Sequence, residues 1–229
     1  MKPIVLMTQT HEYQDQRVAI KHVPLIETVA LDFDDKALCP HYDWLIFTSK
    51  NAVKYFYPYL KLIKYDQLAV VGVKTKQLCD KMKIDVDFCP TDFSQEGLFN
   101  QHPFKKGDRV LIPSSRQART FLQNALKESS IQVTKIDLYE VQPKYEGIQE
   151  ILDTMMHRQV DAITFASSSA AHAFFEAKPP HNENIYFAIG QQTAQTIRKL
   201  GYSCFVAEVQ TLESMITKIV EKRFYNDGI

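Results

Sequence analysis

DWLIFTSKNAVKYF, residues 43–56, returns without a gap as DAITFASSSAAHAF, residues 161–174. At the same offset of 118 residues, LAVVGVKTKQLCDK (68–81) falls on YFAIGQQTAQTIRK (186–199). Self-similarity that keeps register over so long a stretch indicates two copies of one supersecondary unit, and the long period predicts duplicated domains rather than a solenoid. The identical positions in the two copies are Asp43/Asp161, Phe47/Phe165, Ser49/Ser167, Ala52/Ala170, Phe56/Phe174, Gly72/Gly190, Thr75/Thr193, Gln77/Gln195 and Lys81/Lys199.

Each copy is built as strand, turn, helix, strand, turn, helix. Apolar runs of strand length are each followed by apolar residues at helical spacing, a pattern typical of a parallel α/β sheet. The residues after Gly72 and after Gly190 continue at that spacing, and Gly201 is a suitable helix stop. Both helices are therefore predicted to be amphipathic and to pack on a sheet.

Two further strands are predicted at KPIVLMTQ (2–9) and DRVLIPSS (108–115), the second followed by the helical RQARTFLQNALKESS (116–130). These strands repeat at an offset of 105 residues, so the order of the units differs between the halves. HVPLIETVALDFDD (22–35) follows the first and VTKIDLYEVQP (133–143) follows the second. We expect these two segments to cross between the halves as extended chain.

The overall charge gives no indication of a nucleic-acid or membrane partner. The 27 basic and 27 acidic residues balance, so an anionic ligand would have to be held by local groups. No segment approaches the ~18 apolar residues of a membrane helix, and the apolar part of MKPIVLMTQ is too short for a signal peptide. The sequence therefore predicts a cytoplasmic protein.

Neither cysteine nor histidine spacing indicates a metal site. The four cysteines form no C-x-x-C pair and sit among apolar neighbours, which favours buried free thiols. The seven histidines show no spacing typical of metal ligands. We expect no metal.

The loops after the predicted strands are the candidate ligand-binding segments, because ligands of open parallel sheets bind beyond the carboxyl ends of the strands. These loops are rich in hydroxyl and amide side chains. They are TSKN (48–51), ASSS (166–169), GVKT (72–75), GQQT (190–193), PSSR (113–116) and TQTHEY (8–13).

Most of these residues also have an ordinary structural interpretation. Ser and Thr are natural N-caps wherever a strand leads into a helix, and capping is the commoner role. Gly72 and Gly190 belong to no G-x-G-x-x-G or phosphate-loop motif, so a tight turn or close helix approach is more usual than nucleotide binding. Lys50, Lys74, Arg116 and Arg119 could pair with ligand carboxylates, but basic residues in the first turn of a helix are more often solvated surface.

Tyr139 is a candidate for acid–base chemistry. It lies in the second crossing segment, where a phenol could donate a proton, although an aromatic in a strand usually packs, and Tyr145 shares that ambiguity. We find no G-x-S-x-G elbow, paired-carboxylate signature or Cys/His dyad. Acyl transfer and ordinary hydrolysis therefore lose support.

LIFTSKNAV (45–53), VVGVKT (70–75), ITFASSSA (163–170) and AIGQQTA (188–194), taken in order, resemble the uroporphyrinogen-III synthase family. The resemblance covers nearly the whole chain, with RVLIPSSRQAR and DLYEVQP in the expected places between these motifs. No single motif is specific to the family, since each is only a short strand and turn. The four motifs in this order are specific to it.

The resemblance implies two flavodoxin-like parallel-sheet α/β domains joined by a two-stranded β ladder, with the active site in a cleft between them. One domain would be discontinuous, containing residues 1–20 and 144–229, and the other would contain residues 38–134. Residues 21–37 and 135–143 would form the ladder and linkers.

The resemblance also implies a cofactor-free reaction in haem and tetrapyrrole biosynthesis. Hydroxymethylbilane, a linear tetrapyrrole with many carboxylates, loses water and cyclises to uroporphyrinogen III with inversion of its last ring. Such an enzyme is a lyase, and its main task is to hold a flexible substrate in one arrangement. We expect a monomer that meets hydroxymethylbilane synthase transiently and binds neither nucleic acid nor membrane.

The positions that match the family's motifs give the expected site residues. The family's tyrosine near the cleft matches Tyr139, the expected catalytic residue. ASSS has Ala166 and Ser168 where threonine and proline are frequent in the family, and PSSR lacks the usual arginine-glycine pair, with Arg116 displaced. The expected substrate-binding residues are Thr48, Ser49, Lys50, Asn51, Gly72, Thr75, Ser114, Arg116, Ser167, Ser168, Ser169, Gly190, Gln191 and Thr193.

A non-catalytic, hinge-type binder of small polyanions is the alternative, since it would use the same duplicated architecture and fold alone does not settle function. The order of the motifs and Tyr139 favour the synthase. A binder would be expected to place stronger charged anchors in its turns.

Overall fold

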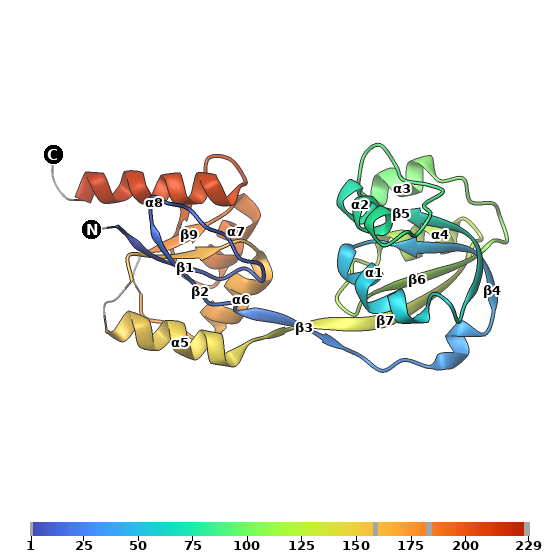
Figure 1. Ribbon diagram of the computed structural model, residues 1–229, viewed down its shortest axis with the longest axis horizontal. Coiled ribbons are helices and arrows are strands. Elements are labelled where there is room, and N and C mark those ends of the chain that lie inside the picture. Colours follow the sequence, from blue (N-terminus) through green and yellow to red (C-terminus); the bar gives the residue numbers. More distant parts are fainter. Residues whose placement is uncertain (1, 158–159, 182–184, 227–229) are drawn as a thin grey trace. The chain divides into compact units, whose positions relative to one another are not determined.

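The computed structural model describes residues 2–157, 160–181 and 185–226 (Figure 1). The chain divides into two compact units. Unit 1 contains residues 1–27 and 141–229, and unit 2 contains residues 28–140. Each unit has its own sheet and its own hydrophobic cores, so the fold is α/β with two predominantly parallel sheets, as the sequence predicts.

Unit 1 is built on a five-stranded parallel sheet in the order β10-β9-β8-β1-β2. Helices α5, α6 and α7 pack on one face around Phe165 and Phe174, and α8 covers the other face through Ile216 and Ile219 (Figure 1). The strands are β1 (Ile4–Met7), β2 (Ala19–His22), β8 (Ala162–Phe165), β9 (Tyr186–Ala188) and β10 (Phe205–Val206), and the helices are α5 (Tyr145–Met156), α6 (Ser168–Glu176), α7 (Gln191–Lys199) and α8 (Leu212–Asn226).

Unit 2 has a second sheet in the order β3-β7-β6-β4-β5. Helices α1 and α2 pack on one face around Phe47 and Phe56, while α3 and α4 pack on the other around Trp44 and Leu126. The strands are β3 (Ile26–Ala30), β4 (His41–Phe47), β5 (Lys64–Val70), β6 (Arg109–Ser115) and β7 (Gln132–Pro143), the α-helices are α1 (Lys50–Phe56), α2 (Val73–Lys81), α3 (Gln95–Gln101) and α4 (Phe121–Glu128), and the 3₁₀ helices are η1 (Asp35–Leu38) and η2 (Tyr57–Tyr59).

The sequence repeat is reproduced in the strand pairing. Phe47 on β4 pairs with Val70 on β5, and their counterparts 118 residues later, Phe165 and Ala188, pair in the same register. The 105-residue offset between β1 and β6 is reproduced too, since Leu45 pairs with Leu111 as Ile163 pairs with Leu6. The two units are therefore copies of one sheet topology.

One shared contact explains the repeated aspartate. The Asp43 carboxylate accepts a hydrogen bond of 2.7 Å from the backbone N–H of Arg109, the first residue of β6. Asp161 accepts one of the same length from Ile4, the first residue of β1. In both units the carboxylate satisfies an N–H at the start of the neighbouring strand.

Two local predictions need correction. The predicted helix 116–130 begins only at Phe121, because Ser115 Oγ accepts the backbone N–H of Gln117 and the Arg116 N–H donates to the Tyr139 carbonyl. Arg116 therefore lies in a turn, and both Arg116 and Arg119 precede the helix instead of lying in its first turn. Within the predicted extended segment 22–35, strand β3 covers only Ile26–Ala30.

The predicted C-terminal stop at Gly201 is present. Gly201 has a φ of +89°, in the left-handed region that glycine tolerates best. Across the described residues, none of the helices is both long and apolar enough to cross a membrane.

Candidate active site

Each sheet has a point at which the strand order reverses, and such points are where open parallel sheets bind ligands. In unit 2 this point lies between β4 and β6, which are neighbours, with β5 on one side and β7 on the other. Ser49 follows β4, and Ser114 and Ser115 end β6. In unit 1 it lies between β8 and β1, where Ser167 and Thr8 follow the strands.

Ser49 and Ser167 are helix N-caps in the structure. Ser49 Oγ accepts the backbone N–H of Ala52 at 3.1 Å, and Ser167 Oγ accepts that of Ala170 at 3.2 Å. Both serines are half-buried. Capping uses one acceptor site of each hydroxyl and leaves its proton available for another contact.

Tyr139 lies over the carboxyl end of β6. Its hydroxyl is 3.1 Å from Ser49 Oγ, its ring stacks on that of Tyr55 at a centroid distance of 4.8 Å, and it is only 5% exposed. A shift in the β6–β7 register between Ser114 and Ser115 pairs Ser115 with Tyr139 and skips Leu138. This irregularity, together with the stack on Tyr55, places the phenol within reach of Ser49 across the end of β6.

Burial keeps the Tyr139 phenol protonated. Loss of solvent raises its pKa above the ordinary value, the hydrogen bond to Ser49 lowers it in part, and the nearby Tyr55 raises it further. Tyr55 is itself fixed, since its hydroxyl donates to the Thr28 carbonyl at 2.9 Å. The site therefore contains a rigid, neutral phenol with a proton to donate.

Arg116 adjoins this cluster through both backbone and side chain. Its N–H donates to the Tyr139 carbonyl at 2.9 Å, and its guanidinium donates to Glu140 Oε2 at 2.6 Å. The Arg116 side chain is 55% exposed, so this ion pair contributes little to stability and the guanidinium remains accessible to an anion.

The two glycines at the strand ends are not needed for a left-handed turn. Gly72 and Gly190 are helix N-caps with φ of −140° and −169°, extended values that any residue adopts. A Cβ on Gly190 would approach Gln210 Cδ to 3.2 Å, whereas one on Gly72 would be 4.0 Å from its nearest neighbour, Phe93 O. Close packing against Gln210 therefore explains a glycine at position 190, whereas position 72 has no such neighbour.

The other expected residues divide between the two sheet edges. Thr75 and Thr193 are 5% and 4% exposed, and Ser114 is 2% exposed, so these side chains face their own unit's interior more than its surface. Accessible residues at the unit 2 edge are Thr48, Lys50 and Asn51, and those at the unit 1 edge are Ser168, Ser169 and Gln191.

Tyr55 is not among the residues predicted from the sequence, although the internal repeat contains a signal for it. The repeat aligns Tyr55 with Ala173, so the aromatic is present in one copy only. The β1–β2 pairing ends at Met7 and His22, so it contains no position that corresponds to Tyr139. Tyr55 is therefore a position at which the two copies of the repeat differ chemically.

A family model described as uroporphyrinogen-III synthase HemD matches residues 13–217, most of the chain. The chain belongs to the uroporphyrinogen-III synthase family. Family membership does not favour the non-catalytic binder.

Individual relatives agree with the family match. The chain is 26% identical over 214 residues to the porphyrin biosynthesis protein HemD of Ruminiclostridium josui, covering 86% of this chain but only 42% of that longer protein. It is 24% identical over 233 residues to a chloroplastic uroporphyrinogen-III synthase of Oryza sativa subsp. japonica, covering 95% of this chain and 76% of the relative. The crystal structure of a uroporphyrinogen-III synthetase from Helicobacter pylori 26695 superposes with a TM-score of 0.68 at 21% identity, covering 96% of this chain and 99% of that one, which shows a shared fold.

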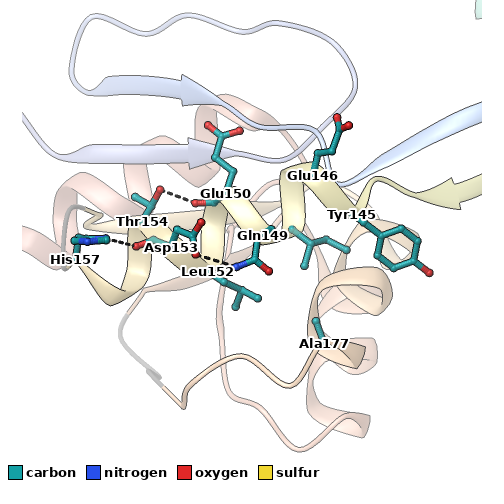
Figure 2. Close-up of a pocket in the computed structure, with 10 residues that line it drawn as sticks. Tyr145, Glu146, Gln149, Glu150, Leu152, Asp153, Thr154, His157 and Ala177 are labelled. Atoms are coloured by element: carbon teal, nitrogen blue, oxygen red, sulfur yellow. Dashed lines mark hydrogen bonds between the residues drawn. The ribbon is translucent and has the colours of Figure 1, made fainter.

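Three surface hollows of this family member lie away from the expected residues. One of about 920 Å³ runs along α5, where Gln149 bonds Asp153 and the Thr154 hydroxyl bonds the Glu150 carbonyl (Figure 2). Several of its polar side chains thus bond within the helix, and Glu150 also forms an ion pair with Lys21 on β2.

Two more hollows form a repeated pair. One is lined by Tyr57, Met82 and Lys83, the other by their counterparts 118 residues later, Phe175, Leu200 and Gly201. Because the same hollow occurs in both copies beside the ends of corresponding helices, we interpret it as a product of the fold.

Proposed function

We propose that this chain catalyses the cyclisation of hydroxymethylbilane to uroporphyrinogen III, the lyase reaction expected of its family. The observation that carries the proposal is the neutral Tyr139 phenol in contact with Ser49 at a strand-order reversal, in a chain of this family. The reaction needs a proton for a departing hydroxyl and a framework that holds a flexible polyanion, and both are available at this sheet edge.

The substrate supplies most of the reactivity. The electrons of a pyrrole ring expel the hydroxymethyl oxygen, which takes up a proton and leaves as water. The azafulvene that results is attacked by the substituted carbon of the last ring to give a spiro intermediate, which breaks and recloses with that ring inverted. A proton lost on rearomatisation balances the one consumed, so the net change is loss of one water.

Tyr139 and Ser49 would provide the first proton. Ser49 Oγ already accepts the Ala52 N–H, and when it also accepts the Tyr139 O–H its own proton points outward to a ligand. Ser49 is the more exposed of the two, so it would touch the departing hydroxyl and be reprotonated by Tyr139.

The helices that follow the strand ends suit a polycarboxylate. Helices α1, α2, α6 and α7, and also α4, carry no acidic residue in the first turn, whereas α3, α5 and α8 carry Glu96, Glu146 and Glu213 there. Acidic residues are favoured in first turns because they complement the positive end of the helix dipole. Their absence from the four helices at the strand ends leaves that positive end for a ligand anion.

The hollow along α5 is a poor site for the same ligand. Glu146, Glu150 and Asp153 line it, and their charges would repel the substrate's carboxylates. We therefore place the substrate at the carboxyl ends of the strands, in contact with residues of the expected set.

The proposed setting is the cytoplasm, with the protein acting as a monomer. Its substrate would come from hydroxymethylbilane synthase through transient contact, because hydroxymethylbilane cyclises spontaneously to the unrearranged isomer.

The test is incubation of the purified chain with freshly made hydroxymethylbilane, followed by oxidation and chromatographic separation of the type I and type III isomers. We expect the type III isomer to form at a rate proportional to protein concentration. Formation of type I alone, at the rate of the protein-free control, would refute the proposal.

A further inference from the structure

Two buried side-chain atoms at one corner of unit 1 have no hydrogen-bond partner. They are Gln9 Oε1 and His22 Nε2, the only such atoms among the described residues. Gln9 follows β1 by two residues, and His22 is the last residue of β2. Both therefore lie at the carboxyl end of the sheet, beside the strand-order reversal.

The register places the two side chains on the same face of the sheet. Met7 pairs with His22 across β1 and β2, so their side chains point the same way. The Gln9 amide nitrogen is 3.8 Å from Met7 Sδ, which puts Gln9 on that face too. This is the face that α8 covers through Met7 and Ile216.

The orientation of the Gln9 amide follows from its one contact. A thioether sulfur is a weak acceptor, so it suits the amide N–H₂ and not the carbonyl oxygen. Gln9 is 7% exposed, so the oxygen is held out of solvent as an acceptor without a donor.

Leaving such an atom unpaired is costly. The loss is about 1–3 kcal/mol for a buried polar group, and an apolar side chain of the same size, such as methionine, would avoid it. Native proteins contain few such atoms, and those they keep call for an explanation. Two on adjacent strands at a predicted ligand edge indicate a ligand that carries both a donor for Gln9 and a polar group for His22.

We propose that Gln9 and His22 form a subsite for one pyrrole ring of the linear tetrapyrrole. Gln9 Oε1 accepts the pyrrole N–H, and His22, in the tautomer with the proton on Nε2, donates to a carboxylate on the same ring or the next. This inference rests on the proposed function and names the substrate groups that the unit 1 edge binds.

The chemistry of the two atoms favours this assignment. Gln9 Oε1 is an acceptor only, so it would repel a carboxylate and attract an N–H. A pyrrole ring with acidic side chains offers a donor and an acceptor a few bonds apart, which matches one acceptor and one donor on neighbouring strands.

The internal repeat shows that this corner is specialised. At the 105-residue offset, Gln9 corresponds to Ser114, and the paired strands match His22 with Lys135. The corresponding positions of unit 2 therefore do not carry the same pair of groups.

The test uses Gln9→Met, which keeps the side-chain volume and removes the unpaired oxygen. We expect KM for hydroxymethylbilane to rise about 3- to 10-fold, the effect of one lost hydrogen bond between uncharged groups. The type III share of the product should fall, because a less restrained ring closes more often without inversion. The thermal midpoint should stay the same or rise, since an unsatisfied polar group has been removed.

Gln149→Met is the matched control. Gln149 is an exposed glutamine on α5 of the same unit, bonded to Asp153, so the same substitution there should leave KM and the type III share unchanged. His22→Phe should raise KM in the same direction as Gln9→Met. If Gln9→Met fails to fold, Gln9→Asn keeps the amide but withdraws it by one carbon, and the same rise in KM is expected.

The outcomes separate this inference from the proposed function. Absence of type III product with the wild-type chain would refute the function. Wild-type formation of type III, with KM and type III share unchanged in Gln9→Met or Gln9→Asn, would overturn the subsite alone. A lowered thermal midpoint with unchanged KM would assign Gln9 a purely structural role.

Discussion

At the scale of single residues, the structure separates two roles that the sequence left open for the serines at the strand ends. Ser49 and Ser167 both cap helices, but only Ser49 also touches a tyrosine. A capping bond and a contact with the proposed proton donor therefore coexist on one hydroxyl. The internal repeat supplies a control for the role of Ser49, because Ser167 makes the same capping bond without a contact to a tyrosine.

Replacing Tyr139 by phenylalanine should lower kcat by about 10²-fold, the usual contribution of a positioned general acid. The loss should exceed that in Thr193→Ala or Ser167→Ala, because proton delivery is less replaceable than one of several hydrogen bonds. Steady-state kinetics with isomer analysis measures it. Burial holds the phenol's pKa above its usual ~10, so the kcat ratio of wild type to variant should be constant between about pH 7 and 9. Equal kcat would remove Tyr139 from the mechanism.

Ser49→Ala and Ser167→Ala form a matched pair. Each should lower the free energy of unfolding by about 1 kcal/mol, since each loses an N-cap hydrogen bond. Only Ser49→Ala also breaks the contact with Tyr139, so its kcat should be about tenfold lower than that of Ser167→Ala, a difference of one hydrogen bond in the transition state. Denaturant unfolding and steady-state kinetics on both variants give the two quantities. Similar kcat values would mean that Ser49 only caps.

At the scale of elements, the repeat extends to the ends of the helices. Lys83 after α2 and Gly201 after α7 both adopt left-handed backbone, with φ of +57° and +89°. The next residues make the same closing bond, from the Ile84 N–H to the Cys79 carbonyl and from the Tyr202 N–H to the Ile197 carbonyl. One copy has the favoured glycine at this position, and the other carries a strained lysine.

Lys83→Gly should therefore stabilise unit 2. The left-handed conformation costs a non-glycine residue about 1–2 kcal/mol, and the greater unfolded-state freedom of glycine returns about 0.5–1 kcal/mol of that. A net gain of roughly 0.5–1 kcal/mol is expected in urea unfolding. Gly201→Ala is the reciprocal variant and should destabilise unit 1. A loss of stability in Lys83→Gly would contradict this account of the helix end.

The first turn of α5 depends on a missing side chain. A Cβ on Gly147 would lie 2.3 Å from the Pro24 carbonyl oxygen, a backbone atom that cannot move alone. Gly147→Ala should lower the free energy of unfolding by about 1–3 kcal/mol, the range for overpacking. Gly72→Ala is the control, since its Cβ would have no neighbour closer than 4.0 Å and its backbone is extended. Thermal unfolding of both variants measures the difference, and equal midpoints would show that α5 shifts freely.

The elements that could be predicted from sequence are those in which local pattern and repeat agree. Strands β4, β5, β8 and β9, with the helices that follow them, combine an apolar run, a capping position and a second copy. Strand β2 could not be predicted, because AIKH is short, half polar and at a sheet edge. The start of α4 could not be predicted either, because the backbone at Arg116 bonds to Tyr139, which is distant in sequence.

The same limit applies to the candidate site. Sequence pattern identifies Tyr139 and Ser49 separately, but their contact depends on a register shift between β6 and β7 that no local pattern encodes. Gln9 and His22 stand out only when burial and missing partners are known. All of the proposed site residues, including Tyr139 and Ser49, remain predictions.

At the scale of the whole molecule, the chain contains a thiol in the core of each unit. Cys79 is fully buried in unit 2, where burial raises its pKa to about 11, and Cys204 packs against the core of unit 1 with its pKa raised by burial. Cys39 is exposed. Because the thiolate is the reactive form, the two core thiols should react only when their own unit opens.

Alkylation during denaturant titration should therefore report the two units separately. Near pH 8, Cys39 should be modified at once, and mass spectrometry of peptides should then follow Cys204 for unit 1 and Cys79 for unit 2. In Gly147→Ala, the denaturant concentration at which half of Cys204 is modified should fall in proportion to the loss of unfolding free energy. The corresponding concentration for Cys79 should not change. A joint shift of both thiols would show that the units unfold as one.

Unit 1 is assembled from both ends of the chain, and its strand β1 pairs with β8, which follows more than a hundred residues later. On the ribosome, β1 and β2 therefore emerge long before the partners they need. Residues 28–140 leave the exit tunnel as an uninterrupted stretch that holds nearly all of the other sheet. We expect the inner unit to fold first during translation, and protection of Cys79 in stalled nascent chains that lack β8 would reveal it.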